Sequence, residues 1–207
     1  MITQELRRRT SARGGDSVDW ESIARGMIDG VTEFSIPASI ELANLDSLFY
    51  QRRGLKSVVI PSNITSLPNS LFRYCYGLNS VMLHNAITKI GQRVFEYCTS
   101  LSSIELPSSL TTIDMYAFMY SGLVSITIPS SVTSLGAQSF RFCRQLQTVV
   151  MQSSTPPTLG ANTVFSNGHS GLTIYVPDGS VEAYKTATNW SAFADKIKPL
   201  SELGGGI

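Results

Sequence analysis

The side chains in this sequence that could act as nucleophiles or metal ligands are three cysteines and two histidines. Cys75, Cys98 and Cys143 are 23 and 45 residues apart, and none of them belongs to a CxxC pair. His84 and His169 are 85 positions apart, with no ligand pattern near either of them. Because a zinc site needs about four ligands at short spacings, the sequence predicts no metal site, and nothing in it indicates a cofactor.

Serine and carboxylate side chains could also do chemistry, but their arrangement does not indicate catalysis. The sequence has no GxSxG nucleophile elbow, no glycine-rich phosphate loop and no HExxH motif. The aspartates and glutamates are scattered, and no pair of them recurs as an acid/base set. We therefore expect a protein without catalytic residues that is not an enzyme.

Aromatic rings and guanidinium groups, in contrast, recur at a regular spacing. A ring follows a phenylalanine by two residues at Tyr74, Tyr97, Tyr120 and Phe142, and we expect Tyr50 to stand in register before them. Arginines flank this column at Arg52, Arg53, Arg73, Arg141 and Arg144. Tyrosine with arginine is typical of protein contact surfaces, and aromatic stripes also stack on sugars. The candidate partner-binding residues are therefore Tyr50, Tyr74, Tyr97, Tyr120, Phe142, Arg73, Arg141 and Arg144.

The ring column also allows a purely structural interpretation, in which the rings lie over a bend in the chain and seal the edge of the core. The two interpretations differ in what they predict for exposure. A binding stripe has exposed or half-exposed rings, whereas five rings that are all buried would exclude it.

The elements that position these side chains follow from an internal repeat. Units of 23, 23, 22 and 23 residues begin at Leu55, Leu78, Leu101 and Leu123, and degenerate copies begin at residues 31 and 146. Each unit has a leucine, two aliphatic residues spaced by two, usually a proline, a second aliphatic pair and then Phe-x-x-Cys. One unit cannot bury so much apolar surface alone, so repeats of this kind stack into a solenoid.

Each unit predicts a short strand with one side turned inward. Val58 and Ile60 are two residues apart and point to the same side, and the same holds for Ile104 and Leu106 two units later. The cysteines share one repeat position, which we interpret as a small core side chain. His84 takes the place of the strand-ending proline. At about 4.8 Å per coil, six to seven coils make a stack roughly 30 Å long.

Both ends of a solenoid expose apolar surface and need caps. We expect an α+β fold: a right-handed stack of about 23-residue coils with short parallel strands, capped by helices at both ends. The expected parts are a basic N-terminal segment and capping helix over 1–30, the solenoid over 31–170, a strand–helix cap over 171–200 and a flexible tail over 201–207. Trp190 and Phe193 are expected to turn inward in the C-terminal cap.

Composition restricts the classes of function further. The 207 residues are 43% apolar and 15% charged, with a formal net charge of +1. The near-zero charge argues against nucleic-acid binding, and no apolar run reaches the length of about 18 residues that a membrane span needs. The basic run near the N-terminus is not followed by an apolar stretch, so we expect no secretory signal peptide.

The repeat L-x-S-I-x-I-P-x-x-[VIL]-T-x-[IL]-x-x-x-x-F-x-x-C resembles the BspA-type leucine-rich repeat over about residues 31–154. The ending, TPPTLGANTVF followed by IYVPDGSVEAYKTATNWSAFADKI at 155–197, is similar to a C-terminal unit common in such proteins. The resemblance implies a non-enzymatic binding or adhesion scaffold, of a kind found on bacterial surfaces and in gut bacteria and their phages.

Two functions stay open. The chain could be an adhesion module that recognises a protein or carbohydrate ligand through an exposed face of the solenoid. It could instead be a structural subunit of a larger assembly, such as a phage tail or surface layer, in contact with other virion or surface proteins. The expected location is a virion or the bacterial surface by a non-Sec route, and otherwise the cytoplasm.

Overall fold

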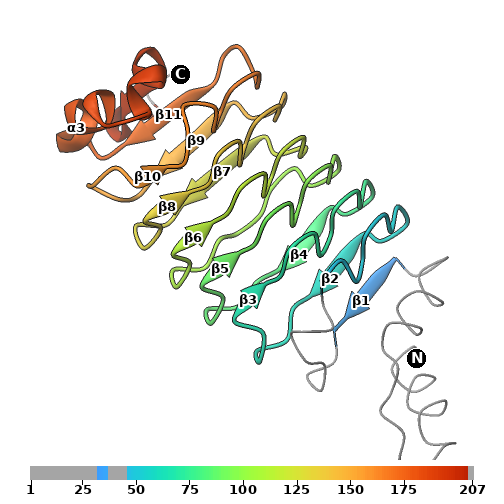
Figure 1. Cartoon of the computed structure of the whole chain (residues 1–207). Coiled ribbons are helices and arrows are strands. Elements are labelled where there is room, and N and C mark those ends of the chain that lie inside the picture. The colour runs from blue at the N-terminus through green and yellow to red at the C-terminus, as the bar shows by residue number, and fades with distance from the viewer. Residues whose placement is uncertain (1–31, 37–45, 205–207) are drawn as a thin grey trace, which may run out of the picture.

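The computed structural model describes residues 32–36 and 46–204. They form a parallel β-solenoid of about seven turns, in which each coil lies against the next along the stack (Figure 1). The helix expected over the N-terminal 30 residues lies outside the described residues. No helix in the described part of the chain is long and apolar enough to cross a membrane.

Seven strands lie along the front of the stack and form two parallel sheets. The first sheet joins β1 (Glu33–Ser35), β2 (Ser57–Val59) and β4 (Ser80–Met82). The second joins β7 (Ser125–Ile128), β9 (Thr148–Met151), β11 (Thr173–Val176) and β12 (Ile197–Pro199). Val58 lies opposite Val81, which is the 23-residue spacing of the repeat.

Five strands of two residues each form one continuous parallel sheet on the back of the stack. In order they are β3 (Ser66–Leu67), β5 (Lys89–Ile90), β6 (Thr112–Ile113), β8 (Ser134–Leu135) and β10 (Thr158–Leu159). The second residue of each strand is buried in the core. These leucines and isoleucines belong to the second aliphatic pair of each repeat unit, and they point into the core as the repeat predicts.

The front face is interrupted between β4 and β7. The strand expected through Ile104 and Leu106 is not formed, because no backbone hydrogen bond joins residues 103–106 to either neighbouring coil. Ile104 nevertheless points into the core. On the other side of this coil β6 pairs with both β5 and β8, so the coil keeps its place in the stack.

Phenylalanine and cysteine fill the bend side of the core. Six phenylalanines stack with ring centroids 5.1–5.6 Å apart: Phe49, Phe72, Phe95, Phe118, Phe140 and Phe165. The three thiols are fully buried, and each donates to the carbonyl of the phenylalanine one coil earlier, over 2.9–3.2 Å. The interpretation of the cysteines as core side chains is therefore confirmed.

Short helices close the C-terminal end of the stack. They are η2 (Asp178–Ser180), α3 (Val181–Thr186), η3 (Trp190–Lys196) and η4 (Leu200–Glu202), of which only α3 is an α-helix. The inward turn expected of Trp190 and Phe193 is confirmed, since both are buried and contact Phe165, the last ring of the stack. The indole N–H of Trp190 donates to the carbonyl of Pro157 over 2.8 Å.

The α+β description is not supported, because the described repeats contain strands and bends but no helix. Five bends hold two residues each with left-handed backbone and the bend around Phe165 holds one, and that conformation stops an α-helix from propagating. Helical capping at the C-terminus is only weakly shown. The expected domain boundaries stay predictions.

Candidate functional site

The bends that connect the back strands to the next front strands carry the predicted ring column. In the five bends around Phe49 to Phe140 the residues two before and two after the phenylalanine have left-handed backbone; around Phe95 these are Arg93 (φ 58°) and Tyr97 (φ 62°). The N–H groups of Phe95 and Tyr97 donate to the next coil, at Ala117 (2.7 Å) and Met119 (2.9 Å). This ladder holds the bends in register, so equivalent side chains form columns.

Four of the predicted rings form one stack along the outside of the bends. The centroids of Tyr74 and Tyr97 are 4.8 Å apart, those of Tyr97 and Tyr120 are 4.4 Å apart, and Phe142 follows Tyr120 at 4.6 Å. The interplanar angles are 10–19°, so the rings lie face to face. All four are half-buried. The column is thus a half-exposed stripe, although its role in binding stays a prediction.

The predicted register of Tyr50 is wrong. Gln51, not Tyr50, occupies the left-handed position that matches Tyr74, because Tyr50 follows Phe49 by one residue instead of two. The Tyr50 ring still reaches the column and contacts Tyr74 edge-on at 5.6 Å, with 37% of the residue exposed. We call these five rings, Tyr50, Tyr74, Tyr97, Tyr120 and Phe142, the aromatic ridge.

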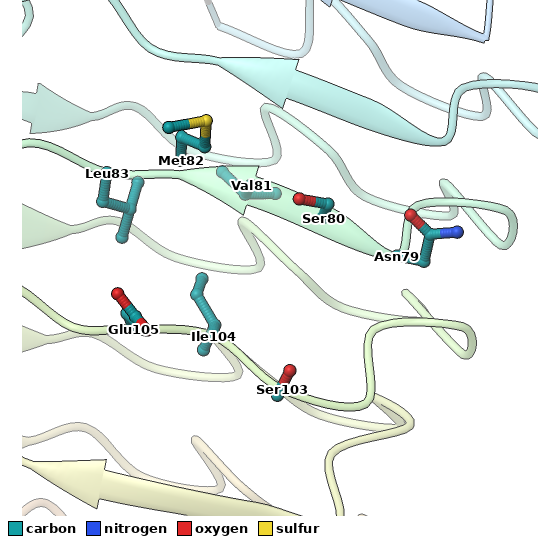
Figure 2. A pocket seen from close by; sticks show the side chains of 8 residues that line it. All are labelled: Asn79, Ser80, Val81, Met82, Leu83, Ser103, Ile104 and Glu105. Carbon is teal, nitrogen blue, oxygen red and sulfur yellow. The ribbon is translucent and has the colours of Figure 1, made fainter.

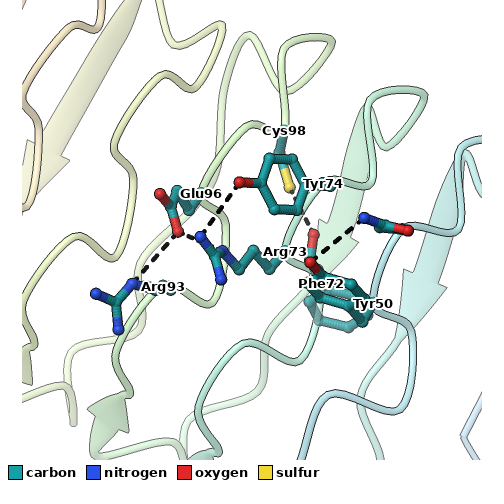
Figure 3. A network of polar contacts seen from close by, with 8 residues as sticks. Tyr50, Phe72, Arg73, Tyr74, Arg93, Glu96 and Cys98 are labelled. Atoms are coloured by element: carbon teal, nitrogen blue, oxygen red, sulfur yellow. Dashed lines mark hydrogen bonds and ion pairs between the residues drawn. The ribbon is translucent and has the colours of Figure 1, made fainter.

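Arg73 lies between the first two rings of the ridge and a buried carboxylate (Figure 3). Its guanidinium carbon is 4.7 Å from the Tyr74 ring centroid and 6.0 Å from that of Tyr50. Its Nε is 2.6 Å from Oε2 of Glu96, which also forms an ion pair with Arg93 at 3.6 Å. The Arg73–Glu96 contact is an ion pair without an aligned hydrogen bond. One carboxylate is therefore shared between two guanidinium groups.

Arg141 and Arg144 flank the far end of the ridge. The Arg141 guanidinium carbon is 4.5 Å from the centroid of Phe142, and its Nη1 donates to Oε1 of Gln138 over 2.8 Å. Arg144 is exposed. Neither arginine forms an ion pair with any residue that the structure describes.

The structure adds four residues to this surface that the sequence analysis did not select. Tyr76 contacts Tyr74 at 6.1 Å and lies under the guanidinium of Arg53 at 5.2 Å. The guanidinium carbon of Arg93 lies 4.6 Å from the ring centroid of Tyr116. Glu96 forms ion pairs with both Arg93 and Arg73. Tyr116 and Arg93 share one repeat position, two residues before the phenylalanine. Both could therefore have been predicted from the aligned units as neighbours of the aromatic ridge.

The hydroxyl of Tyr97 has a raised pKa, chiefly because of burial among its neighbours, and the nearby Tyr120, Tyr74 and Glu96 add to the shift. The hydroxyl of Tyr97 therefore remains a proton donor in neutral solution. Tyr74 also accepts a hydrogen bond from Nη2 of Arg73 over 3.2 Å.

Two shallow grooves on the front face flank the unpaired segment 103–106. One, of about 270 Å³, lies between β4 and Ser103–Glu105 and has the exposed Met82 at its rim (Figure 2). The other, of about 450 Å³, lies between the same segment and β7. Glu105 is the only titratable side chain in either lining, so these grooves offer no set of groups for acid–base or metal chemistry.

The described residues hold no group of three or more His, Cys, Asp or Glu side chains that could bind a metal ion. His84 and His169 each accept a backbone hydrogen bond at Nδ1, from Ala86 (3.2 Å) and Gly171 (3.0 Å). Both imidazoles thus stabilise local turns.

The stacked parallel coils and the repeated inward leucine define the class of this protein as a leucine-rich repeat solenoid. Residues 30–179 match the family model described as the BspA type leucine rich repeat region, in six copies, and the chain belongs to this family. Proteins with such repeats are generally involved in protein binding or surface functions.

Solved structures share the fold. A leucine-rich repeat protein from Bacteroides ovatus is 19% identical, with a TM-score of 0.51; the match covers 72% of this chain and 48% of that one. The leucine rich repeat protein of T. pallidum is 25% identical, with a TM-score of 0.51 and coverage of 72% and 67%. The chain thus matches about half of the Bacteroides protein's length. No curated protein matches it.

Proposed function

We propose that this protein is a non-enzymatic binding scaffold that recognises a protein partner through the aromatic ridge. The observation that carries the proposal is the backbone of the ridge: Tyr74, Tyr97, Tyr120 and Phe142 all have φ between 59° and 62°. Bulky side chains are uncommon in this conformation, which asparagine and glycine adopt more readily. Asn167 occupies the same position in the following coil, with φ 56°. Rings held at strained positions on the surface suggest selection for contact.

The geometry favours a protein over a carbohydrate as the partner. A sugar stacks on the face of an aromatic ring, and both faces of Tyr97 and of Tyr120 are covered by the neighbouring rings of the stack. The ridge instead offers ring edges, hydroxyls and guanidinium groups. Tyrosine and arginine are the residues most enriched where protein interfaces gain their energy.

A peptide-display selection against the full chain tests the proposal. We expect enriched peptides to lose at least about tenfold in affinity for the double variant Tyr97→Asn/Tyr120→Asn. The matched control is Tyr175→Asn, a half-buried tyrosine on β11 in the second front sheet. Equal binding to wild type and the double variant would overturn the proposal.

Light scattering on the free chain separates recognition from assembly. A recognition module is expected to be a monomer in wild type and in Tyr97→Asn/Tyr120→Asn. A self-associating chain that the double variant converts to a monomer would show that the ridge is buried between copies, as in a structural subunit, and would contradict the proposal. Location on a virion or bacterial surface stays a prediction.

A further inference from the structure

The charge of the bends differs from that of the rest of the chain. From two residues before each phenylalanine to four residues after it, the described bends contain six arginines, namely Arg52, Arg53, Arg73, Arg93, Arg141 and Arg144. They contain one acidic residue, Glu96, and no lysine, so their net charge is +5. The whole chain has a net charge of only +1. The bends along the aromatic ridge therefore hold six of the chain's 16 basic residues but only one of its 15 acidic residues.

The single carboxylate of the bends cannot neutralise this surface. Glu96 is 5% exposed and already pairs with both Arg73 and Arg93. Arg52, Arg53, Arg141 and Arg144 form no ion pair with any described residue. These four arginines form two clusters, one at each end of the ridge, and no carboxylate of the described residues occupies either cluster.

The rings between the two clusters add to the same preference. Because the stack covers the ring faces, a partner meets the ring edges, which carry the positive side of the aromatic quadrupole. The tyrosine hydroxyls along these edges can donate hydrogen bonds to carboxylate oxygens. The exposed ring edges and the guanidinium groups thus both present positive potential to the partner, whereas the negative ring faces are covered by the stack.

The spacing of the clusters gives the length of segment that could reach both. Arg53 follows Phe49 by four residues, and Arg144 follows Phe140 by four residues, which places them four coils apart at one repeat position. At about 4.8 Å per coil the clusters are about 19 Å apart, and an extended chain covers that distance in about six residues.

Resting on the proposed function, we infer that the aromatic ridge binds an extended acidic segment of the partner protein, with carboxylates at both ends of a stretch of about six residues. One end pairs with Arg52 and Arg53, and the other pairs with Arg141 and Arg144. The residues between the ends lie along the tyrosine edges.

Fluorescence polarisation with defined peptides tests this inference. The probe is a labelled peptide of about eight residues with two aspartates at each end, and its control has asparagine in place of every aspartate. We expect the control peptide to bind the full chain about tenfold more weakly, and the variant Arg141→Gln/Arg144→Gln to bind the acidic peptide about tenfold more weakly. Affinity for the acidic peptide should also fall as salt is raised.

The charge-matched control variant is Lys185→Gln/Lys198→Gln, which removes two cations from the C-terminal cap and should change the affinity less than about twofold. Equal affinity for the acidic and asparagine peptides, or an equal loss in this control variant, would overturn the inference. So would binding of a heparin fragment that depends on Arg141 and Arg144 when the acidic peptide does not bind, since the ligand would then be a sulfated glycan.

The peptide-display selection shows whether only the acidic-segment inference fails or the proposed protein-binding function fails as well. If the enriched peptides lack acidic residues but still lose affinity for Tyr97→Asn/Tyr120→Asn, the ridge binds protein and only the acidic preference is wrong.

Discussion

Two neighbouring aromatic residues in one coil, Phe95 and Tyr97, have different physical roles. Phe95 is fully buried in the phenylalanine stack, whereas Tyr97 is half-buried and has a left-handed backbone. A left-handed conformation costs an ordinary residue about 1–2 kcal/mol. The Tyr97 ring stacks face to face on two neighbours, each of which contributes about 0.5–1.5 kcal/mol, and meets Tyr76 edge-on at 6.5 Å. The stacking of Tyr97 therefore little more than offsets the strain.

We predict that Tyr97→Asn lowers the free energy of unfolding by about 1 kcal/mol, because lost stacking is partly offset by relieved strain. Phe95→Ala should lower it by about 3–5 kcal/mol. Urea denaturation of both variants measures the difference. Equal losses would show that the ridge seals the core, as the structural interpretation of the sequence holds.

The buried thiols make stability fall at alkaline pH. Burial raises the pKa of Cys75 to about 12 and of Cys143 to about 11, and it holds the pKa of Cys98 well above its usual value. Unfolded thiols lose their protons near pH 8.5. Between about pH 9 and 11 the unfolded state therefore binds fewer protons than the folded state, and the free energy of unfolding falls as pH rises.

For each thiol, the free energy of unfolding is expected to fall by about 1.4 kcal/mol per pH unit in this range. Below about pH 8 the free energy of unfolding should not change with the ionisation of the thiols. The matched variant is Cys75→Ser/Cys98→Ser/Cys143→Ser, because Ser121 already occupies this repeat position. Denaturation from pH 8 to 11 should show a shallower loss in the variant. Parallel curves for the two proteins would contradict the role given to burial.

The ring column could be predicted from the sequence, because it depends only on the offset of each ring from its phenylalanine. The Tyr50 error arose because that coil has its ring one residue early, with Gln51 at the matching position. The Arg73–Glu96–Arg93 ion pairs could not be predicted, because they depend on side-chain conformations across two coils.

At the scale of elements, the parallel strands and the buried repeat positions follow from the alternation of aliphatic residues. The gap between β4 and β7 does not follow from it. Ile104 and Leu106 keep the same pattern as Val58 and Ile60, yet residues 103–106 have no backbone partner in either neighbouring coil. Pattern predicts which side chains turn inward, whereas pairing depends on the distance between coils.

We predict that the backbone amides of residues 103–106 exchange with solvent much faster than those of β9, because unpaired amides need no opening of structure to exchange. Hydrogen-exchange mass spectrometry or NMR measures this. Protection of residues 103–106 equal to that of β9 would show that the front sheet is continuous in solution.

The C-terminal cap stabilises the last coil through Trp190, whose ring is 1% exposed and contacts Phe165 and Tyr184. We predict that Trp190→Ala lowers the free energy of unfolding by about 3–5 kcal/mol. Ser191→Ala, at the exposed neighbouring position, serves as the control and should change it by less than about 0.5 kcal/mol. Similar values for the two variants in chemical denaturation would show that the cap contributes little.

At the scale of the whole molecule, the solenoid converts a short sequence unit into long columns of equivalent side chains. The net charge of +1 conceals a bend surface with a charge of +5, because eight of the 15 acidic residues lie within residues 1–46 and four more lie within residues 178–202. The composition therefore gives the correct net charge of the whole chain but does not indicate the basic surface of the bends. The regular stacking of coils places four of the bend arginines at the two ends of the aromatic ridge and the other two, Arg73 and Arg93, between them.

The most direct test of the account is to map where a partner binds. In a titration of the ¹⁵N-labelled chain with a display-selected peptide, we predict that the largest chemical-shift changes fall on Tyr74, Tyr97, Tyr120 and Phe142 and on the arginines beside them. The main competing surface is the pair of grooves on the front face, lined in part by Met82 and Ser103–Glu105. Shift changes confined to those groove residues, with the ridge unaffected, would contradict the account.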